Sequence, residues 1–233
     1  MLSIIIPLYN EEKNIFPLYE RLKAVLSFLG KEYEIIFIDD GSEDKSFEVL
    51  RELKSKDSCV KIIKFRRNCG QTSALDAGFR NARGETIISM DADLQNDPQD
   101  IPRLLEALKN SDVVCGWRKK RRDPFLKKIF SLIANSLRRF VLGDRILDIG
   151  CTLRAYRREA LERVKLFNGL HRFLPLLIEY EGFKVAQIEV KHHFRFSGKS
   201  KYRFSKRLLK PFLDLWAVFW MKKNWIRYEY KIF

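Results

Sequence analysis

Two carboxylates separated by a single residue are the clearest chemical signal in this sequence of 233 residues. Asp91 and Asp93 follow the apolar run Thr86–Met90, and Gln95 adds an amide oxygen two positions later. Carboxylates at positions i and i+2 just past a strand can converge on one divalent cation, and Mg²⁺ and Mn²⁺ prefer such oxygen ligands together with substrate phosphates. Neither the P-loop pattern nor GxGxxG occurs in the chain, so a P-loop or dinucleotide-binding loop is not indicated. An Asp-x-Asp triplet is common by chance, and its interpretation depends on its surroundings.

Polar side chains follow three further apolar runs in the same half of the chain. These segments are Tyr9-Asn10-Glu11, Asp39-Asp40-Gly41-Ser42 and Arg66-Arg67-Asn68-Cys69-Gly70-Gln71. Asp, Asn and Gly also favour turns and helix caps, which is a sufficient explanation for any one segment. Four polar segments after four consecutive runs favour a shared binding site at one edge of a sheet.

The apolar runs and the periodic segments between them alternate as in a β-α-β protein. We expect strands at Leu2–Pro7, Glu34–Ile38, Val60–Phe65, Thr86–Met90 and Val113–Trp117, a further strand-like run at Lys184–Val190, and helices at Glu12–Phe28, Lys45–Lys54, Ser73–Asn81 and Ile101–Lys109. Nearly continuous apolar strands are typical of an α/β fold with a mostly parallel sheet and helices on both faces. Ligands bind such sheets beyond the carboxyl ends of the strands, where the polar segments fall.

The charge of the chain is divided unevenly. Residues 1–117 carry 16 basic and 20 acidic side chains, whereas residues 118–233 carry 29 basic and 10 acidic ones. Such an excess implies a polyanionic partner for the second half, either nucleic acid or an anionic membrane surface. The longest uncharged stretch, Met1–Asn10, is too short for a transmembrane helix of about 20 residues and lacks the basic start of a signal peptide. Because the four cysteines are also widely spaced, we expect a cytoplasmic chain.

Two stretches of the second half combine basic residues with apolar residues at helical spacing. Phe125–Leu142 is predicted to form an amphipathic helix soon after the basic cluster Arg118–Arg122. A second helix is predicted to begin near Phe204 and to carry Trp216 and Trp220. Basic amphipathic helices with Trp are typical of a bilayer interface. The alternative is a pair of ordinary helices whose apolar sides face the core and whose Lys and Arg are solvated.

Taken in order, several segments resemble the GT-A glycosyltransferases of family 2, and among them the polyprenyl-phosphate glycosyltransferases that are similar to dolichol-phosphate mannose synthase. The segments that carry the resemblance are Ile5–Glu12, Ile38–Ser42, Arg67–Gly84, Met90–Gln95, Gly169–Phe173 and Arg195–Tyr202. The resemblance spans about residues 2–220. It implies a GT-A (Rossmann-like) fold and the inverting transfer of a hexosyl group from a nucleotide sugar, GDP-mannose or a UDP-hexose, to a polyprenyl phosphate.

On the donor side, the resemblance implies that the first half binds the nucleotide sugar and a Mg²⁺ or Mn²⁺ ion. The implied nucleotide-sugar ligands are Pro7, Tyr9, Glu11, Asp39, Asp40, Gln71, Asp91 and Ala92. The implied metal ligands are Asp91, Asp93 and Gln95, and the implied catalytic residues are Asp91, Asp93 and Arg118. Relatives commonly have Asp-Pro-Pro-Glu soon afterwards, whereas this chain has Asp97-Pro98-Gln99-Asp100. We expect that difference to change only the start of a helix, with Pro98 in its first turn.

On the acceptor side, the resemblance implies that the polyprenyl phosphate is bound by Arg118, Lys127, Ser131, Arg195 and Lys201. The second pKa of a phosphate monoester is about 6, so the acceptor is mostly a dianion near neutral pH and needs no general base. Catalysis then depends on positioning and on charge compensation. Asp148 and Arg154 lie in a further matching segment, for which a structural role and a role in acceptor positioning both stay open.

Three parts of the chain follow from this interpretation: a nucleotide-sugar-binding half (1–117), an acceptor-binding part with the amphipathic helix (118–203), and a C-terminal interfacial helix with its tail (204–233). We expect a peripheral protein on the inner, cytoplasmic face of a membrane that binds no nucleic acid. His192 and His193 are predicted to point to opposite faces of a strand, so neither they nor His171 are predicted as metal ligands.

Two alternatives compete with this prediction. A soluble GT-A enzyme with a sugar or protein acceptor would share the donor site but would not need two basic amphipathic stretches. A basic nucleic-acid-binding protein would explain the charge of the second half. It would leave the polar strand ends of the first half without a role, and the sequence shows no helix-turn-helix, RNP or KH signature.

Overall fold

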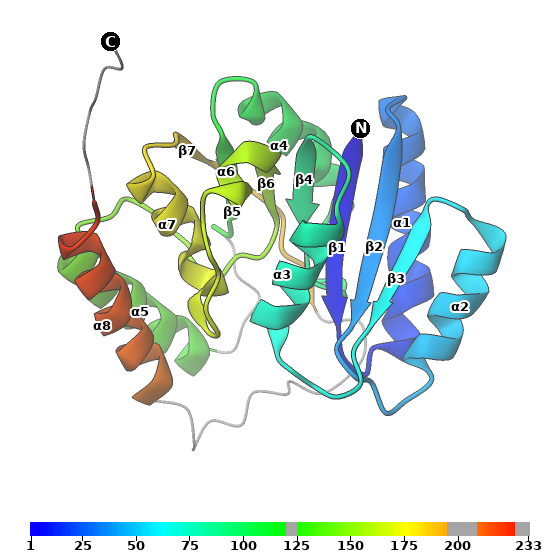
Figure 1. Ribbon diagram of the computed structural model, residues 1–233, viewed down its shortest axis with the longest axis horizontal. Coiled ribbons are helices and arrows are strands. Elements are labelled where there is room, and N and C mark those ends of the chain that lie inside the picture. The colour runs from blue at the N-terminus through cyan, green and yellow to red at the C-terminus, as the bar shows by residue number, and fades with distance from the viewer. Residues whose placement is uncertain (120–124, 195–208, 227–233) are drawn as a thin grey trace, which may run out of the picture.

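The computed structural model describes residues 1–119, 125–194 and 209–226, without the side chains of residues 125–133 and 209–211. In these ranges one sheet of seven strands has the order β3-β2-β1-β4-β6-β5-β7 (Figure 1). The strands are β1 (Leu2–Leu8), β2 (Tyr33–Asp39), β3 (Val60–Lys64), β4 (Thr86–Ser89), β5 (Val113–Trp117), β6 (Arg154–Arg157) and β7 (Val185–Glu189). Only the pairings of β6 with β4 and with β5 are antiparallel among these strands. The sheet is therefore mostly parallel, which confirms the predicted α/β fold.

Helices cover both faces of the sheet. They are α1 (Glu12–Leu29), α2 (Ser46–Lys56), α3 (Gln71–Asn81), α4 (Ile101–Leu108), α5 (Phe125–Leu142), α6 (Arg158–Glu162), α7 (Leu174–Tyr180) and α8 (Leu209–Lys223), with 3-10 turns at Pro98–Asp100 and Leu170–Phe173. Side chains of α1, α2 and α4 form one apolar cluster with the sheet, and those of α3 form another on the opposite face. The bounds predicted for these four helices agree with the observed ones to within about two residues.

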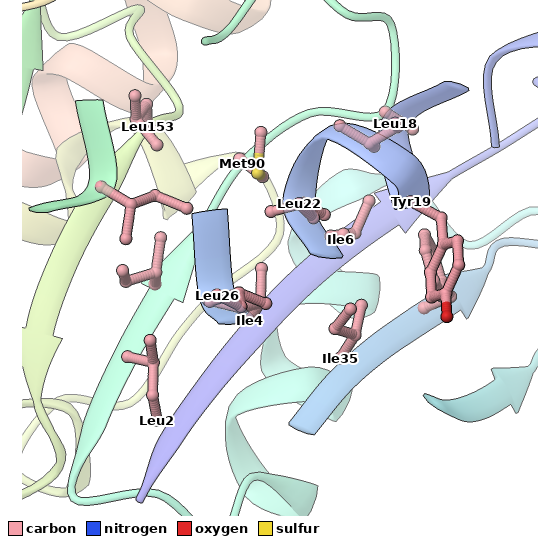
Figure 2. Close-up of a cluster of buried hydrophobic side chains, with 14 of the residues drawn as sticks. Leu2, Ile4, Ile6, Leu18, Tyr19, Leu22, Leu26, Ile35, Met90 and Leu153 are labelled. Atoms are coloured by element: carbon pink, nitrogen blue, oxygen red, sulfur yellow. The ribbon is translucent and has the colours of Figure 1, made fainter. Parts of the chain in front are cut away.

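The sequence of β1 reflects burial on both faces. Ile4 and Ile6 belong to the cluster under α1, whereas Ile5 belongs to the cluster under α3, because successive strand residues point to opposite faces. Figure 2 shows Leu22 of α1 above Ile4 and Ile6. Pro7 lies beyond the pairing of β1 with β4, which ends at Ile5 and Ser89, so the N–H that proline lacks interrupts none of those strand pairs.

β6 has no counterpart among the predicted strands. It has only four residues, and arginines occupy both of its ends, so its alternating pattern is too short to recognise. Pairing on both sides stabilises it nevertheless, because Ala155 lies opposite Ile88 of β4 and Val114 of β5. As a result, the segment before β6 runs beside the loop that follows β4. This loop holds Asp91 and Asp93 and is called the carboxylate loop below.

The sheet crosses the predicted boundary between donor and acceptor parts. β6 and β7 come from residues 118–203, yet they complete the same sheet as β1 to β5. The boundary at residue 117 therefore does not separate two sheets. That the two sides of this boundary have different functions stays a prediction.

α5 and α8 lie side by side at one end of the sheet (Figure 1). Both contribute to an apolar cluster that also includes α7, with Leu142, Leu177, Leu215 and Val218 among its buried members. α5 has the predicted bounds, whereas α8 is described only from Leu209, and residues 204–208 lie outside the described part of the chain. Among the described helices, none is long and apolar enough to cross a membrane.

The packing of α3 on the sheet gives a testable prediction. A Cβ atom on Gly78 would lie 2.5 Å from the Cγ2 atom of Ile5 and 2.9 Å from the Cδ1 atom of Ile38, both buried. Gly78→Ala gains up to about 1 kcal/mol of helix propensity but overpacks the core at a cost of about 1–3 kcal/mol. We expect a net loss of stability, measured as a lower midpoint of thermal unfolding. Arg80→Ala, at an exposed position of the same helix, is the control, and equal midpoints for both variants would contradict this packing.

Candidate active site at the carboxyl ends of the strands

The loop after β4 holds the two predicted metal-binding carboxylates in a compact turn. The backbone N–H of Asp91 donates to Oδ1 of Asn96 (3.2 Å), and the backbone N–H of Gln95 donates to Oδ1 of Asp93 (3.1 Å). Leu94 between them is buried and adopts a left-handed conformation with φ of 61°. A leucine in this conformation is uncommon, so the surrounding contacts must impose the turn.

The oxygen atoms of this loop are of the type that Mg²⁺ and Mn²⁺ prefer, and their role as metal ligands stays a prediction. The side-chain amide nitrogen of Gln95 approaches the carbonyl oxygen of His193 (3.5 Å), which directs its nitrogen, not its oxygen, toward the protein. Among the described residues, no group of three or more His, Cys, Asp or Glu side chains is arranged to hold a metal. Mg²⁺ is commonly bound through one or two carboxylates plus substrate phosphates and water. Asp91, Asp93 and Gln95 are a donor set of that open type.

The first turn of α3 connects this loop to the end of β2. The amide of Gln71 donates to Oδ1 of Asp91 (2.8 Å). Asp40 accepts the backbone N–H groups of Cys69 (2.7 Å) and Gly70 (2.9 Å), and so fixes the turn that leads into α3. Burial raises the pKa of the Asp40 carboxyl, and so does the neighbouring carboxylate of Asp39. The two backbone donors lower this pKa, but the net effect is an increase. The observed contacts of Asp40 are therefore with the backbone, and its part in nucleotide binding stays a prediction.

Asp39 carries an oxygen atom that the described residues leave without a hydrogen bond. Its Oδ1 accepts the backbone N–H of Ser42 (2.8 Å), whereas its Oδ2 is buried and has no partner within the described ranges. A buried polar atom without a partner costs about 1–3 kcal/mol. A donor on a bound nucleotide, such as a ring N–H or a ribose hydroxyl, would remove that cost.

The loops after β1 and β2 are joined by hydrogen bonds. The backbone N–H of Asn10 donates to Oγ of Ser42 (2.9 Å), and that of Glu11 donates to Oγ of Ser46 (2.9 Å). Pro7 lies opposite Ile38 in the register of the two strands. Together these contacts bring three predicted nucleotide ligands beside the end of β2: Pro7 in β1, and Tyr9 and Glu11 in the loop that follows it.

Arg118 is the predicted acceptor ligand whose side chain the structure describes. It follows β5, and its Nε and Nη2 atoms donate to Oδ2 (2.7 Å) and Oδ1 (3.0 Å) of Asp148. Lys127 and Ser131 lie in α5, but their side chains are outside the described part. Arg195 and Lys201 lie outside the described residues altogether. Those four assignments stay predictions.

Arg154, for which two roles were open, makes structural contacts. Its guanidinium is buried and donates to the carbonyl oxygens of Cys151 (2.8 Å) and Ile149 (2.6 Å) on one side. On the other side it donates to the carbonyl oxygens of His171 (3.0 Å) and Arg172 (3.3 Å). It thereby joins two loops that are distant in sequence.

Sequence reasoning gave no role to the contacts that flank these loops. Oγ1 of Thr72, in the first turn of α3, lies 2.7 Å from Nδ1 of His171 and accepts the backbone N–H of Gly169 (3.0 Å). Gly169 and His171 belong to one of the segments that resemble the family. This resemblance was the only sequence feature that pointed to them. The contact between this segment and Thr72 joins residues about a hundred positions apart, so the local sequence pattern does not indicate it.

Two predictions near the carboxylate loop, a helix start at Pro98 and a strand at His192 and His193, have different outcomes. Pro98 is the first residue of a 3-10 turn, and Asp97 caps it by accepting the backbone N–H of Gln99 (3.0 Å), which confirms the predicted helix start. The strand predicted for His192 and His193 is wrong. The bridge between His192 and Asn96 lies outside the named strands, and Nε2 of His193 lies 3.0 Å from Oδ2 of Asp97, because the chain turns there toward the carboxylate loop.

Solved structures share this fold. Glucosyl-3-phosphoglycerate synthase from Mycobacterium tuberculosis, in complex with Mn²⁺, UDP and phosphoglyceric acid, superposes with a TM-score of 0.66 at 19% identity, over 85% of this chain and 72% of that one. A mannosyltransferase from Pyrobaculum calidifontis, in complex with GDP-Man and Mn²⁺, has a TM-score of 0.58 at 17% identity, over 81% of this chain and 54% of the other. At these identities the similarity establishes the GT-A-like fold.

Sequence relatives are more similar. Dodecaprenyl-phosphate galacturonate synthase from Rhizobium johnstonii is 39% identical over 93% of this chain, and undecaprenyl-phosphate 4-deoxy-4-formamido-L-arabinose transferase from Pectobacterium carotovorum is 41% identical over 91%. The chain spans 66% and 65% of the lengths of these two relatives. The family model described as glycosyl transferase family 2 matches residues 3–165. This chain is a member of glycosyl transferase family 2.

Proposed function

We propose that this chain transfers a sugar from a nucleotide-sugar donor to a polyprenyl phosphate, with inversion at the anomeric carbon, at the cytoplasmic face of a membrane. The observation that carries the proposal is the convergence of the Asp91–Asp93 loop, the first turn of α3 and the buried carboxylate of Asp39 at one edge of the sheet. The names of the relatives, which are polyprenyl-phosphate sugar transferases, support this acceptor class.

On the donor side, Asp91, Asp93 and Gln95 would hold the ion, and Gln71 keeps the carboxylate of Asp91 in place. When bound, Mg²⁺ or Mn²⁺ would stabilise the negative charge of the departing nucleotide diphosphate. Asp39 would accept a hydrogen bond from the nucleoside. Pro7, Tyr9, Glu11, Asp40 and Ala92 would surround it.

On the acceptor side, the chain has to position a dianion. The lipid phosphate is its own nucleophile near neutral pH, so no side chain needs to remove a proton. Cationic side chains instead reduce the repulsion between the acceptor phosphate and the donor diphosphate. We assign this role to Arg118, Lys127, Arg195 and Lys201, with Ser131 as a hydrogen-bond donor.

The exposed side of α8 supports a lipid surface as the place of the reaction. Leu215 and Val218 face the core, whereas Trp216 and Trp220 are 56% and 66% exposed, and Phe212 is exposed beside them. On the adjacent helix α5, the apolar side chains of Leu137 and Phe140 are exposed as well, and basic residues lie nearby at Arg139 and Lys223. Exposed Trp beside Lys and Arg is typical of a bilayer interface. This surface favours a lipid acceptor over a soluble acceptor and over nucleic acid.

A donor panel with a short-chain polyprenyl phosphate in liposomes tests the proposal. Donors should include GDP-mannose, UDP-glucose, UDP-N-acetylhexosamine, and nucleotide-linked galacturonic acid and 4-deoxy-4-formamido-arabinose. We expect a lipid-linked product from one donor class that requires Mg²⁺ or Mn²⁺. Transfer only to a soluble sugar or protein would contradict the acceptor assignment.

Asp93→Asn tests the metal assignment. It removes one charge from the carboxylate loop with almost no change in shape, so we expect transfer to fall on the order of 100-fold or more while the thermal midpoint changes little. Mn²⁺-dependent binding of a nucleoside diphosphate, measured by calorimetry, should weaken in parallel. Asp76→Asn, on the exposed side of α3, is the matched control. Near-normal turnover of the Asp93 variant in saturating metal would remove Asp93 from the metal site.

The double variant Trp216→Glu/Trp220→Glu tests the membrane assignment. Both side chains are exposed, so folding should be preserved. We expect sedimentation with anionic liposomes to weaken about 10-fold or more, since burying one large apolar side chain contributes about 1.5–3 kcal/mol. The control is Phe16→Glu/Phe28→Glu, which changes two exposed aromatics on α1. Equal binding by both double variants would exclude the α8 surface as the contact.

Arg195→Ala and Lys201→Ala test the two acceptor residues that the structure leaves undescribed. A hydrogen bond to a charged group contributes about 1.5–3 kcal/mol, which corresponds to roughly a 10- to 150-fold loss of acceptor kcat/KM. Donor hydrolysis should change little. A loss no larger than that of the control Lys231→Ala, and abolished by salt, would mean that both residues only add to a diffuse positive field.

A further inference from the structure

We infer that Asp148 is a positioning residue that sets the direction of the Arg118 guanidinium toward the acceptor phosphate. This inference rests on the proposed function and adds to it a residue whose role the sequence left open. The two residues are 30 positions apart and meet at the end of β5.

The contact between Asp148 and Arg118 is bidentate and well shielded from water. Nε and Nη2 of Arg118 donate to the two carboxylate oxygens at 2.7 and 3.0 Å, and the two side chains are only 12% and 7% exposed. The backbone N–H of Arg118 also donates to Asp148 Oδ2 (3.3 Å). Because a guanidinium is planar and its donors are fixed, two parallel hydrogen bonds determine both its plane and its direction. These two bonds use Nε and Nη2, and we assign the edge that carries Nη1 to the acceptor phosphate.

The loop that carries Asp148 is itself held rigidly. The backbone N–H of Gly150 donates to Asp148 Oδ1 (3.2 Å), and the guanidinium of Arg154 donates to the carbonyl oxygens of Ile149 and Cys151. A Cβ atom on Gly150 would lie 3.2 Å from Nη2 of Arg118 and 3.5 Å from Asp148 Oδ1. The loop therefore fits closely against the ion pair, and one added methyl group would require the guanidinium to shift by a few tenths of an ångström.

Two effects of Asp148 oppose each other. Its negative charge repels a phosphate dianion, whereas its hydrogen bonds keep Arg118 in one orientation. The guanidinium lies between the carboxylate and any anion at its opposite edge, which reduces the repulsion. Without Asp148, Arg118 would have to be reoriented for each acceptor, at a cost of up to about 2 kcal/mol in side-chain freedom. We therefore expect the loss of Asp148 to lower acceptor kcat/KM. If repulsion between Asp148 and the phosphate dominated, acceptor kcat/KM would rise instead.

The other end of the same strand offers a matched ion pair. Asp112, just before β5, lies 3.5 Å from Nε of Arg157, and both side chains are partly exposed. Asp112→Asn removes an Arg–Asp pair from β5 at the edge opposite the carboxylate loop. It controls for the general effect of losing such a pair.

The experiment compares Asp148→Asn, Gly150→Ala and Asp112→Asn in the full chain, with liposomes that contain a short-chain polyprenyl phosphate. For Asp148→Asn we expect acceptor kcat/KM to fall roughly 10-fold, mainly through KM, as for one charge-assisted hydrogen bond. Gly150→Ala, which removes no charge, should show a smaller loss of the same kind. Donor KM and donor hydrolysis should stay near the wild-type values, and Asp112→Asn should leave acceptor KM unchanged. The thermal midpoint of Asp148→Asn should fall, because a shielded ion pair loses one of its charges.

A double-variant cycle decides whether Asp148 acts through Arg118. If it does, Asp148→Asn in an Arg118→Ala background causes no further loss of acceptor kcat/KM. An additive loss, an increase in acceptor efficiency, or a parallel change in donor KM would each overturn the inference. A wild-type chain that makes no lipid-linked product with any donor would instead overturn the proposed function.

Discussion

The close approach of α3 to the sheet is the constraint on which the donor side of the site depends. The absence of a side chain at Gly78 lets the helix axis come near Ile5 of β1 and Ile38 of β2. That distance, together with the turn that Asp40 fixes, determines where the first turn of the helix lies. Gln71 in that turn can reach the carboxylate loop only from there. A packing contact in the core thus sets the position of a polar contact at the edge of the sheet.

Arg154 has a comparable effect on the proposed acceptor side. A guanidinium without water around it has to satisfy its N–H groups internally, and here four carbonyl oxygens from two loops do so. One loop carries Asp148 and the other carries His171, which contacts Thr72 in the first turn of α3. The Arg118–Asp148 ion pair and helix α3 are therefore attached to one buried side chain. Both are anchored to β6, the strand that Arg154 begins.

Much of the fold could be predicted from the sequence, because the strands are apolar on both faces and α1 to α4 show clear helical periodicity. The Asp91–Asp93 loop was also predictable, since its residue types and its place after a strand are local properties. Pairings between distant segments were not predictable. The contact of Arg118 with Asp148 joins two charges that separately resemble solvated surface residues. β6 is too short, and too rich in arginine, for an alternating pattern to indicate it.

The structure also changes what the positive charge of the second half means. Several of its arginines are committed to internal contacts: Arg118 with Asp148, Arg138 with Asp144 (3.1 Å), Arg157 with Asp112, and Arg154 with carbonyl oxygens. The first three of these pairs contribute no net charge to the outer surface. Asp144 and Asp148 are already counted in the net charge of residues 118–233, so of these pairs only that of Arg157 with Asp112 lowers the excess further. Salt screens the attraction of the remaining charge over about 8 Å. In the proposed contact with a bilayer, the exposed aromatics of α8 would add apolar contact to this electrostatic attraction.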